Sequence, residues 1–436
     1  MMRVHAWTRR VALAVSMAAG ALCVAAPADA VAQAATGPLP DNVAQTPPPP
    51  APGVDAQLDS ARAARGQSVS VAIYSYGPGD EVFERFGHIA LAVTDANTGE
   101  DIAFNWGMFD FAEPNFLWRF LTGDTRYWMA GYRTFEFNAA YQGQNRTIRK
   151  QVLNLSPMQR GALYDFVTWN AREENKYYRY DYYNDNCSTR VRDALDWVLR
   201  GALRTALDST DGHHTWRDET ARITADNLPV YIGIQIGLGR VADRHLTRWQ
   251  RAFLPEYLAA DLARLRVNGL PVITQDTVLF AADRVPMPAD APYRTMSFLA
   301  VGLALGVLVF ALARIAPPVL GVFGVLWYAV GGVLGTALLL GGTVTRHMPY
   351  VGSNLNLTLL SPLLLMAAVT WVARARATRT GRAGRALAAV VAGIALVGLV
   401  LEHLPGFTQG SMLLFMAVVP VHVALAITAN RKRSPA

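Results

Sequence analysis

Five long apolar stretches dominate the second half of the chain. They cover residues 296–315, 319–344, 357–373, 386–404 and 411–429. A helix that crosses a bilayer needs about 20 mostly apolar residues; the first two stretches clearly reach that length, and the third and fourth lie near the minimum. The pattern predicts an α-helical membrane domain of about five spans over residues 293–430, followed by a basic tail at 431–436.

Shorter patterns precede these stretches. Residues 69–76, 89–94 and 102–106 are short apolar runs bounded by Gly, Pro, Asp or Asn, which is typical of β-strands, and Asn97-Thr98-Gly99 forms a turn between the last two. Ser156-Pro157 then begins a helix that continues to Ala171. We therefore expect a folded α+β domain over residues 67–292.

The N-terminus has the pattern of a secretory signal. Arginines precede the apolar run 11–26, small residues follow it, and residues 1–34 are predicted to be the signal peptide. Residues 35–66 are rich in Pro and Ala, which predicts a linker. Removal of the signal would discard Cys23 and leave Cys187 as the one thiol of the chain. A single thiol in an oxidising compartment forms no internal disulfide, so its presence points to chemistry.

The net charge of +7 reflects topology rather than nucleic-acid binding. On an alternating path through the membrane, Arg314, the arginines of 374–385 and the 431–433 tail all fall on one side. The positive-inside rule places that side in the cytoplasm, so the domain before the first span faces outward. The signal peptide independently requires the same orientation.

Cys187 is predicted to open a helix. Val191, Leu195 and Val198 fall on one helical face, and Asp185 and Asn186 are good N-cap residues. A thiol in the first turn sits at the positive end of the helix dipole, which lowers its pKa below the ordinary value of about 8.5 and favours the thiolate. The alternative interpretation is a buried structural cysteine.

A thiol nucleophile needs a base and a group that orients it, and His88 is the best candidate for the base. His88 follows Gly87 at the head of the second strand, and the expected pairing brings Asn105 of the next strand alongside it. Asp101 and Asp110 are less well placed alternatives. For all three of these polar residues the alternative role is ordinary hydrogen bonding at strand ends.

Further polar and aromatic groups are candidates for substrate contact. Asn186 adjoins the thiol, and Arg190 and Arg192 are placed to meet a lipid phosphate, with salt bridging as the alternative. Two loops between spans are expected on the outer face; they carry His347, Asn354, Asn356, Glu402 and His403, which would line a boundary site unless they are simply solvated. The aromatic segments 116–121 and 127–129 are either core or an acyl-binding or interfacial surface. No metal-ligand cluster or phosphate-binding glycine loop is recognised in the sequence, so we expect no cofactor.

Together these motifs resemble a known family. The order of a strand-heading His, a polar residue on the next strand and a later Asn-Cys helix is similar to the circularly permuted papain-like fold of lecithin retinol acyltransferase and NlpC-type peptidases. The chain more closely resembles the periplasmic domain of the Lnb-type lipoprotein N-acyltransferases, over about residues 68–292, through the segments 86–91, 104–111, 155–157 and 178–193. The membrane half, with Asn354-Leu-Asn356 and Ser361-Pro-Leu363, is similar in layout.

This resemblance implies a bacterial inner-membrane enzyme with a periplasmic catalytic domain. Its acyl donor would be a phospholipid and its acceptor the N-terminal amine of a diacylated lipoprotein, with Cys187 carrying the acyl group. Two other classes stay open from the sequence. One is a membrane-anchored cysteine amidase or endopeptidase acting on cell-wall peptide, which needs one span rather than five. The other is a non-catalytic binding module of an envelope complex.

Overall fold

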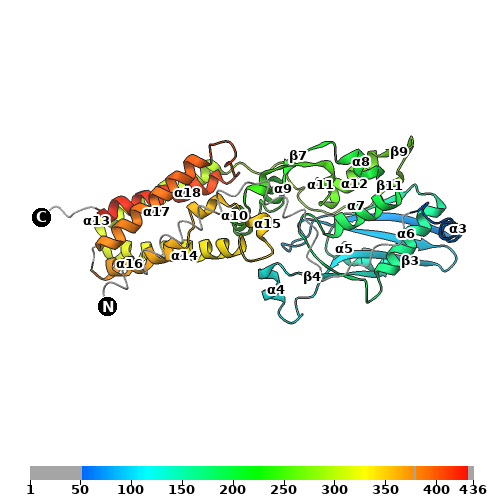
Figure 1. The fold of residues 1–436 in the computed structure, drawn as a ribbon, viewed down its shortest axis with the longest axis horizontal. Helices are drawn as coiled ribbons and strands as arrows, with labels where there is room; N and C mark the ends of the chain where they lie inside the picture. The colour runs from blue at the N-terminus through cyan, green and yellow to red at the C-terminus, as the bar shows by residue number, and fades with distance from the viewer. Residues whose placement is uncertain (1–51, 378–379, 431–436) are drawn as a thin grey trace. The chain divides into compact units, whose positions relative to one another are not determined.

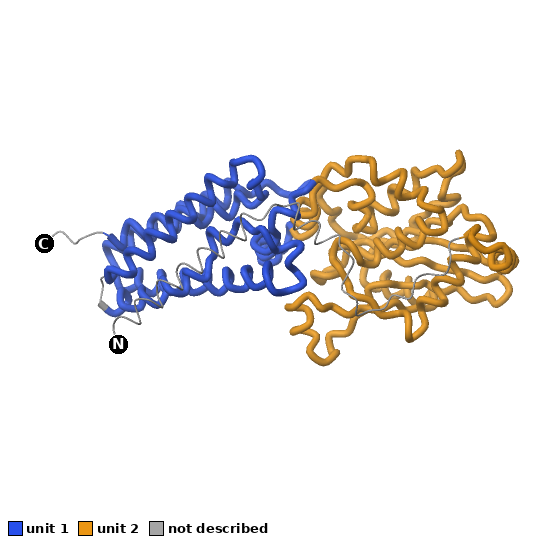
Figure 2. The backbone as a smooth tube through the Cα atoms, in the orientation of Figure 1, with its two compact units in different colours: residues 1–38, 225–244, 290–436 blue, residues 39–224, 245–289 orange. Residues whose placement is uncertain are grey.

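A computed structural model describes residues 52–377 and 380–430. Within these ranges the chain forms two compact units (Figure 2). The α/β unit contains residues 52–224 and 245–289, and the helical unit contains residues 225–244 and 290–430 apart from the two undescribed positions. The predicted signal peptide, the first part of the predicted linker and the basic tail lie outside the described residues.

The α/β unit is built on an antiparallel sheet with the strand order β11-β5-β1-β2-β3-β4-β6 (Figure 1). The strands are β1 (Val69–Tyr76), β2 (His88–Asp95), β3 (Glu100–Met108), β4 (Arg126–Arg133), β5 (Ile148–Leu153), β6 (Tyr177–Arg179) and β11 (Ile273–Phe280). The three predicted strands are present as β1, β2 and β3. The predicted turn joins β2 to β3, with the Gly99 N–H donating to the Asp95 carbonyl at 2.8 Å.

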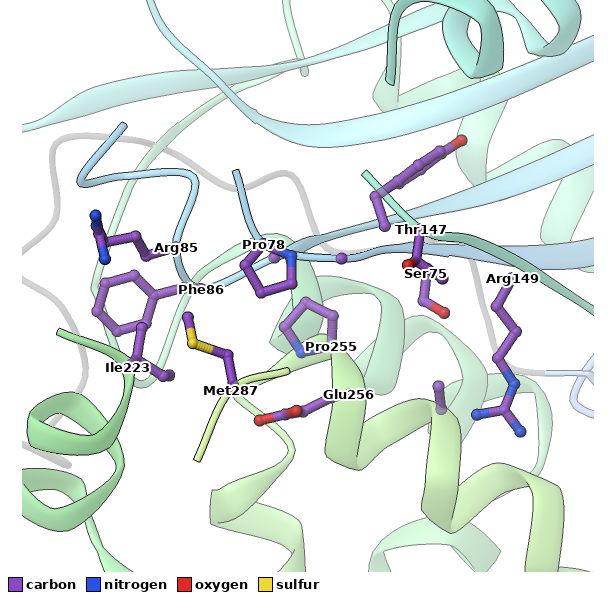
Figure 3. Close-up of a pocket in the computed structure, with 14 residues that line it drawn as sticks. Ser75, Pro78, Arg85, Phe86, Thr147, Arg149, Ile223, Pro255, Glu256 and Met287 are labelled. Atoms are coloured by element: carbon purple, nitrogen blue, oxygen red, sulfur yellow. The ribbon is translucent and has the colours of Figure 1, made fainter. Parts of the chain in front are cut away.

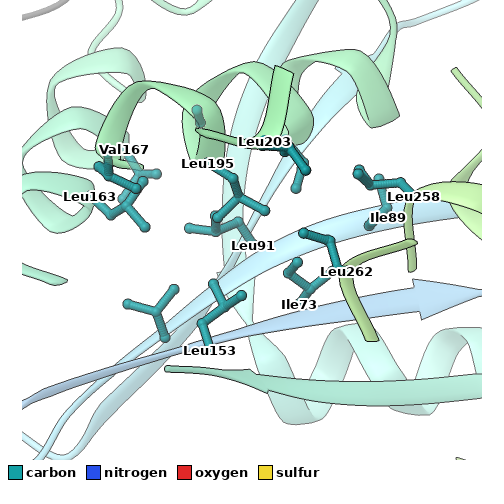
Figure 4. Packing of buried hydrophobic residues seen from close by; sticks show 14 of the residues in the cluster. Ile73, Ile89, Leu91, Leu153, Leu163, Val167, Leu195, Leu203, Leu258 and Leu262 are labelled. Carbon is teal, nitrogen blue, oxygen red and sulfur yellow. The ribbon is translucent and has the colours of Figure 1, made fainter. Parts of the chain in front are cut away.

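Helices cover both faces of this sheet because residues along each strand alternate between the faces. On one face, Ile73, Ile89 and Leu91 pack against α6 (Pro157–Asn170), α7 (Cys187–Val198) and α12 (Pro255–Arg264) (Figure 4). On the other face, Tyr74 and Tyr76 pack against α5 (Thr134–Gly143). The α6 helix begins at the predicted Ser156-Pro157 signal, with a capping box between Ser156 and Gln159.

Smaller elements complete the α/β unit. They are α3 (Ala56–Arg65), α4 (Phe116–Thr122), α8 (Ala202–Leu207), β7 (Asp211–Thr215), α9 (Trp216–Ile223), β8 (His245–Thr247), α11 (Arg248–Arg251), β9 (Arg266–Val267) and β10 (Leu270–Pro271). The α3 helix differs from the linker expected up to residue 66. Asp55 caps it through the Gln57 and Leu58 N–H groups, and Arg62 is buried and paired with Asp165 of α6 at 3.5 Å. Docking on α6 thus orders a segment of low hydrophobicity.

The helical unit contains helices at all five predicted spans. These are α13 (Thr295–Ile315), α14 (Pro317–Gly341), η2 with α16 (Leu355–Thr358 and Leu363–Ala377), α17 (Arg382–Leu401) and α18 (Met412–Asn430). Within the described residues, these five are long and apolar enough to cross a bilayer. The buried face of α14 is rich in glycine, as expected where membrane helices approach closely.

The helical unit also holds a segment that the sequence pattern placed in the α+β domain. Residues 225–244 form α10 (Leu228–Gly237) and η1 (Arg240–Asp243), which belong to the helical unit together with α15 (Met348–Val351). Asn354 donates to the carbonyls of Ile236 and Gly237, both at 3.0 Å, and Asn356 donates to that of Gln235 at 2.9 Å. These amides satisfy the last carbonyls of an apolar helix that has no such partners of its own.

We predict that Gly161→Ala undocks α3. A β-carbon at Gly161 would lie 2.0 Å from the Arg62 carbonyl oxygen, which is backbone and cannot rotate away. Overpacking costs about 1–3 kcal/mol, so trypsin cleavage after Arg62 and Arg65 should accelerate roughly tenfold or more. Gly143→Ala in α5 is the matched control because its β-carbon would meet no atom within 4 Å. Equal cleavage rates in the two variants would contradict the packing described here.

Candidate active site

Cys187 is the first residue of α7, as predicted. The Asn186 Oδ1 accepts from the N–H groups of Ser188 at 2.9 Å and Thr189 at 3.0 Å, while the Thr189 Oγ1 accepts from the Asn186 N–H at 2.7 Å. This capping box starts the helix at the thiol. Val191 and Leu195, on the buried face of α7, are fully shielded and hold the helix against the sheet.

A later segment anchors the start of α7. The Asn186 Nδ2 donates to the Phe253 carbonyl at 3.0 Å, and the Ser188 Oγ donates to the Ala252 carbonyl at 2.7 Å. Asn186, which the sequence suggested for substrate contact, therefore uses both ends of its amide within the protein. Its observed contacts position the thiol.

His88 and Asn105 meet as the expected strand pairing suggests. The His88 Nε2 lies 3.1 Å from the Asn105 Oδ1, and the Asn105 Nδ2 donates to the Ala103 carbonyl at 2.8 Å, which fixes the orientation of the amide. An amide oxygen only accepts, so Nε2 carries the proton of a neutral ring and Nδ1 is left as an acceptor. Asp101 and Asp110 are engaged elsewhere: Asp101 accepts from Thr94 and Thr134, and Asp110 accepts from the Ala112 N–H.

A bulge in β3 brings the thiol to the two strands. The pairing of β3 with β4 shifts register between Asn105 and Met108, and Gly107 there has φ of 95°, in the left-handed region that favours glycine. A β-carbon at Gly107 would lie 3.7 Å from the Cys187 Cβ. The backbone of Ile89, the residue after His88, is near enough to lower the pKa of the Cys187 thiol. Cys187 thus lies beside the head of β2 and the bulge of β3.

Burial keeps both groups neutral. It raises the pKa of the Cys187 thiol to about 11, outweighing the Ile89, Ser188 and Cys187 N–H groups and the Arg146 charge, which all lower that pKa. Burial also lowers the pKa of His88 to about 4; the bond to Asn105 opposes this shift and the Arg146 charge adds to it. The expectation of a lowered thiol pKa therefore fails, because desolvation exceeds the helix-terminus effect. At neutral pH the pair is a thiol and an uncharged imidazole.

Sequence patterns did not single out two of the surrounding side chains. Arg146 is buried, donates through Nε to the Gly77 carbonyl at 2.8 Å, and lies 4.4 Å over the Tyr141 ring. The Tyr178 hydroxyl is buried without a hydrogen-bond partner among the described residues, 4.0 Å from the β-carbon position of Gly107. Neither residue belongs to a sequence motif that would indicate a role at the site. Both are brought near the thiol only by the folding of the sheet.

The two arginines of α7 already have protein partners. Arg190 forms a two-point ion pair with Asp185 and stacks 4.2 Å over the Tyr178 ring. Arg192 is buried, pairs with Asp193 at 2.8 Å and stacks 3.9 Å over the Trp249 ring. The salt-bridging alternative thus describes both arginines, and a lipid phosphate would have to compete with these contacts.

The other expected substrate contacts lie in the helical unit. Asn354 and Asn356 are fully buried and hold α10, as described above. Glu402 is buried as well and accepts from the Gln409 N–H at 2.9 Å, whereas His347 is partly exposed at the start of α15. The buried members of this set are part of a polar network inside the helical unit rather than solvated loop residues.

A small cleft opens beside the head of β2 (Figure 3). Its volume is about 180 Å³, and its lining includes Phe86, Gly87, Pro255, Glu256 and Met287. Gly87 directly precedes His88, so the cleft lies next to the backbone at the head of β2. Pockets that enclose drug-sized ligands span roughly 300–1,000 Å³. This cleft is therefore too small to enclose the acyl chains of a phospholipid.

A thiol, an imidazole and an orienting amide on one α/β unit, joined to five apolar helices, define a membrane-anchored protein with a candidate cysteine site. Residues 56–222 match the family model of the Lnb N-terminal periplasmic domain. The match includes His88, Asn105 and Cys187. No curated protein and no solved structure matches the chain. The family supports a periplasmic location for the N-terminal domain and a role in lipoprotein processing; the papain-like fold stays a prediction.

We predict that alkylation of Cys187 by iodoacetamide accelerates with pH up to about 11. Only the thiolate reacts, and burial raises the pKa of this thiol to about 11, so the rate should rise about tenfold per pH unit below that value. Mass spectrometry of the full chain in detergent measures the rate. The control is Leu270→Cys, an exposed position, whose profile should level off near pH 8.5. A Cys187 profile that levels off below the control would refute the neutral-pair description.

Proposed function

We propose that the chain is a lipoprotein N-acyltransferase of the bacterial inner membrane. It moves a fatty acyl group from a phospholipid, through a thioester on Cys187, to the N-terminal amine of a diacylated lipoprotein. The observation that carries this proposal is the His88–Asn105 hydrogen bond beside the Cys187 helix start, inside the domain that matches the Lnb family. The five apolar helices supply the contact with lipid that both substrates require.

The first half of the reaction forms the thioester. As the Cys187 sulfur attacks the ester carbonyl carbon, the free Nδ1 of His88 removes the thiol proton, so no separate thiolate has to persist in the buried site. The tetrahedral intermediate then collapses and the carbon–oxygen ester bond breaks. The imidazolium gives its proton to the departing alkoxide, which leaves as the hydroxyl of a lysophospholipid. Asn105 stabilises the charged ring through Nε2–H.

The second half transfers the acyl group. The lipoprotein amine attacks the thioester carbonyl, His88 takes the amine proton, and the carbon–sulfur bond breaks to give the amide. The same proton then restores the Cys187 thiol. Each half passes through an oxyanion, for which the Cys187 N–H at the start of α7 and the Tyr178 hydroxyl are candidate donors beside the thiol.

We expect the full chain, incubated with labelled phospholipid in detergent or nanodiscs, to form a hydroxylamine-sensitive acyl adduct on Cys187. Thioesters are cleaved by neutral hydroxylamine, whereas amides and ordinary esters resist it. Cys187→Ser should yield no hydroxylamine-sensitive adduct, while Cys23→Ser should leave the yield unchanged. Mass spectrometry that locates the adduct on any other residue would rule out the proposed nucleophile.

The identity of the acyl acceptor is tested separately. The chain is expressed in a host depleted of its own N-acyltransferase, and the masses of the host lipoproteins are measured. The chain should restore the mass of triacylated lipoproteins, and Cys187→Ala should not. Cleaved muropeptides with unchanged lipoproteins would instead establish a cell-wall peptidase. Full restoration by Cys187→Ala would establish a binding module.

A further prediction concerns Asn105. Removing the acceptor of Nε2–H by Asn105→Ala frees the ring to turn and should slow adduct formation about 10–100-fold. Asn105→Asp places a carboxylate there, which favours the imidazolium and raises the pKa of His88 from about 4. The reaction needs the neutral ring, which exists above that pKa, so the acidic limb of the rate profile should move to higher pH.

The rate of adduct formation, measured between pH 4 and 8, checks this shift. Asn97→Asp in the exposed turn between β2 and β3 is the control and should keep the original limb. An unmoved limb in Asn105→Asp would exclude His88 as the titrating base.

A further inference from the structure

The short helix α4 exposes a largely apolar surface, with Arg119 and Thr122 as its polar residues. Its outward residues Leu117, Trp118 and Leu121 are 68%, 68% and 56% exposed. The Phe116 ring packs against those of Phe109 and Phe111, with centroids 6.0 Å and 5.1 Å away. A cluster of large apolar side chains this exposed is normally covered by a partner or a membrane. Core packing, one of the two roles considered for this segment, therefore applies to the Phe116 side of α4. The side with Leu117, Trp118 and Leu121 is not buried within the α/β unit.

Aromatic contacts connect α4 to the candidate site. We name the row formed by Phe116, Phe109, Tyr127 and Tyr180 the aromatic row. Its ring centroids are separated by 6.0 Å, 5.0 Å and 4.4 Å in that order. At its end, the Tyr180 ring lies 3.9 Å from the β-carbon position of Gly107, next to Cys187. A row of packed aromatic rings thus connects the exposed helix with the core around the thiol.

The bilayer is the partner that fits this surface. The same chain carries five apolar helices that could span a membrane, so lipid is present at high effective concentration around the α/β unit. Tryptophan is favoured at the boundary between lipid and water, and exposed apolar patches of this kind mark binding surfaces. The cleft beside His88 holds only about 180 Å³, so the acyl chains of a donor need a different surface.

We propose that α4 inserts into the leaflet of the bilayer that faces the α/β unit, and that the aromatic row guides a phospholipid acyl ester from that leaflet to Cys187. The insertion stands on the exposed apolar face and the membrane anchor. The guiding role rests on the proposed function.

The insertion is tested with the full chain in nanodiscs, in a Cys23→Ser, Cys187→Ser background. An environment-sensitive fluorophore is attached to Trp118→Cys and, as the matched control, to Leu270→Cys, which is 64% exposed on a hairpin of the same unit. The label at position 118 should emit at shorter wavelength and be quenched at least about fivefold more strongly by spin-labelled lipids than the label at position 270. Equal, water-like emission at both positions would overturn the insertion.

The guiding role is tested by comparing two acyl donors, with variants of a chain that is otherwise native. For each variant, the acylation rate with bilayer phospholipid is divided by the rate with a water-soluble short-chain nitrophenyl ester. The triple variant Leu117→Ser, Trp118→Ser, Leu121→Ser should lower this ratio by about tenfold or more. Leu270→Ser should leave this ratio unchanged. An unchanged ratio in the triple variant would overturn the guiding role. Absence of any adduct on native Cys187 would instead refute the proposed function, while the fluorescence result would still decide the insertion.

Discussion

The position of Cys187 depends on how the first turn of α7 is held. Its apolar face packs on the sheet, and the capping amide of Asn186 and the hydroxyl of Ser188 bind the carbonyls of Phe253 and Ala252. Moving this turn would pull the thiol away from the head of β2 and the bulge of β3. The bulge matters equally, because it brings Gly107, whose left-handed φ favours glycine, into contact distance of Cys187.

This close packing has an electrostatic consequence. A helix start and neighbouring N–H groups favour the thiolate, but removing the sulfur from water costs more, and the thiol stays protonated. The imidazole is shielded in the same way and stays uncharged. Such a pair resists chance oxidation and alkylation, since both need a thiolate. In the proposed reaction the thiolate would form only when a substrate is in place to accept it.

Local patterns predicted much of this arrangement. The three strands, the capped helices and the membrane spans follow from periodicity and from Ser156 and Asn186, and the alignment of His88 with Asn105 follows from one short turn. The features that local patterns did not predict depend on contacts between segments far apart in the sequence. Arg146, between α5 and β5, is held near the site by its bond to the Gly77 carbonyl. The α3 helix is ordered by docking on α6, and the thiol pKa is set by burial. Composition also suggested a continuous domain to residue 292, whereas α10 is held by Asn354 and Asn356, more than a hundred residues further along the chain.

The route of the chain through the two units has a consequence for biogenesis. Residues 225–244 leave the α/β unit, and residues 245–289 return to it with α12, edge strand β11 and the two carbonyls that hold the start of α7. A nascent chain that has reached residue 222 therefore has its thiol but lacks the segment that fixes it. The site is completed only by residues made immediately before the first membrane helix. A chain cut after residue 222 would therefore keep Cys187 but lose the two carbonyls that hold the start of its helix.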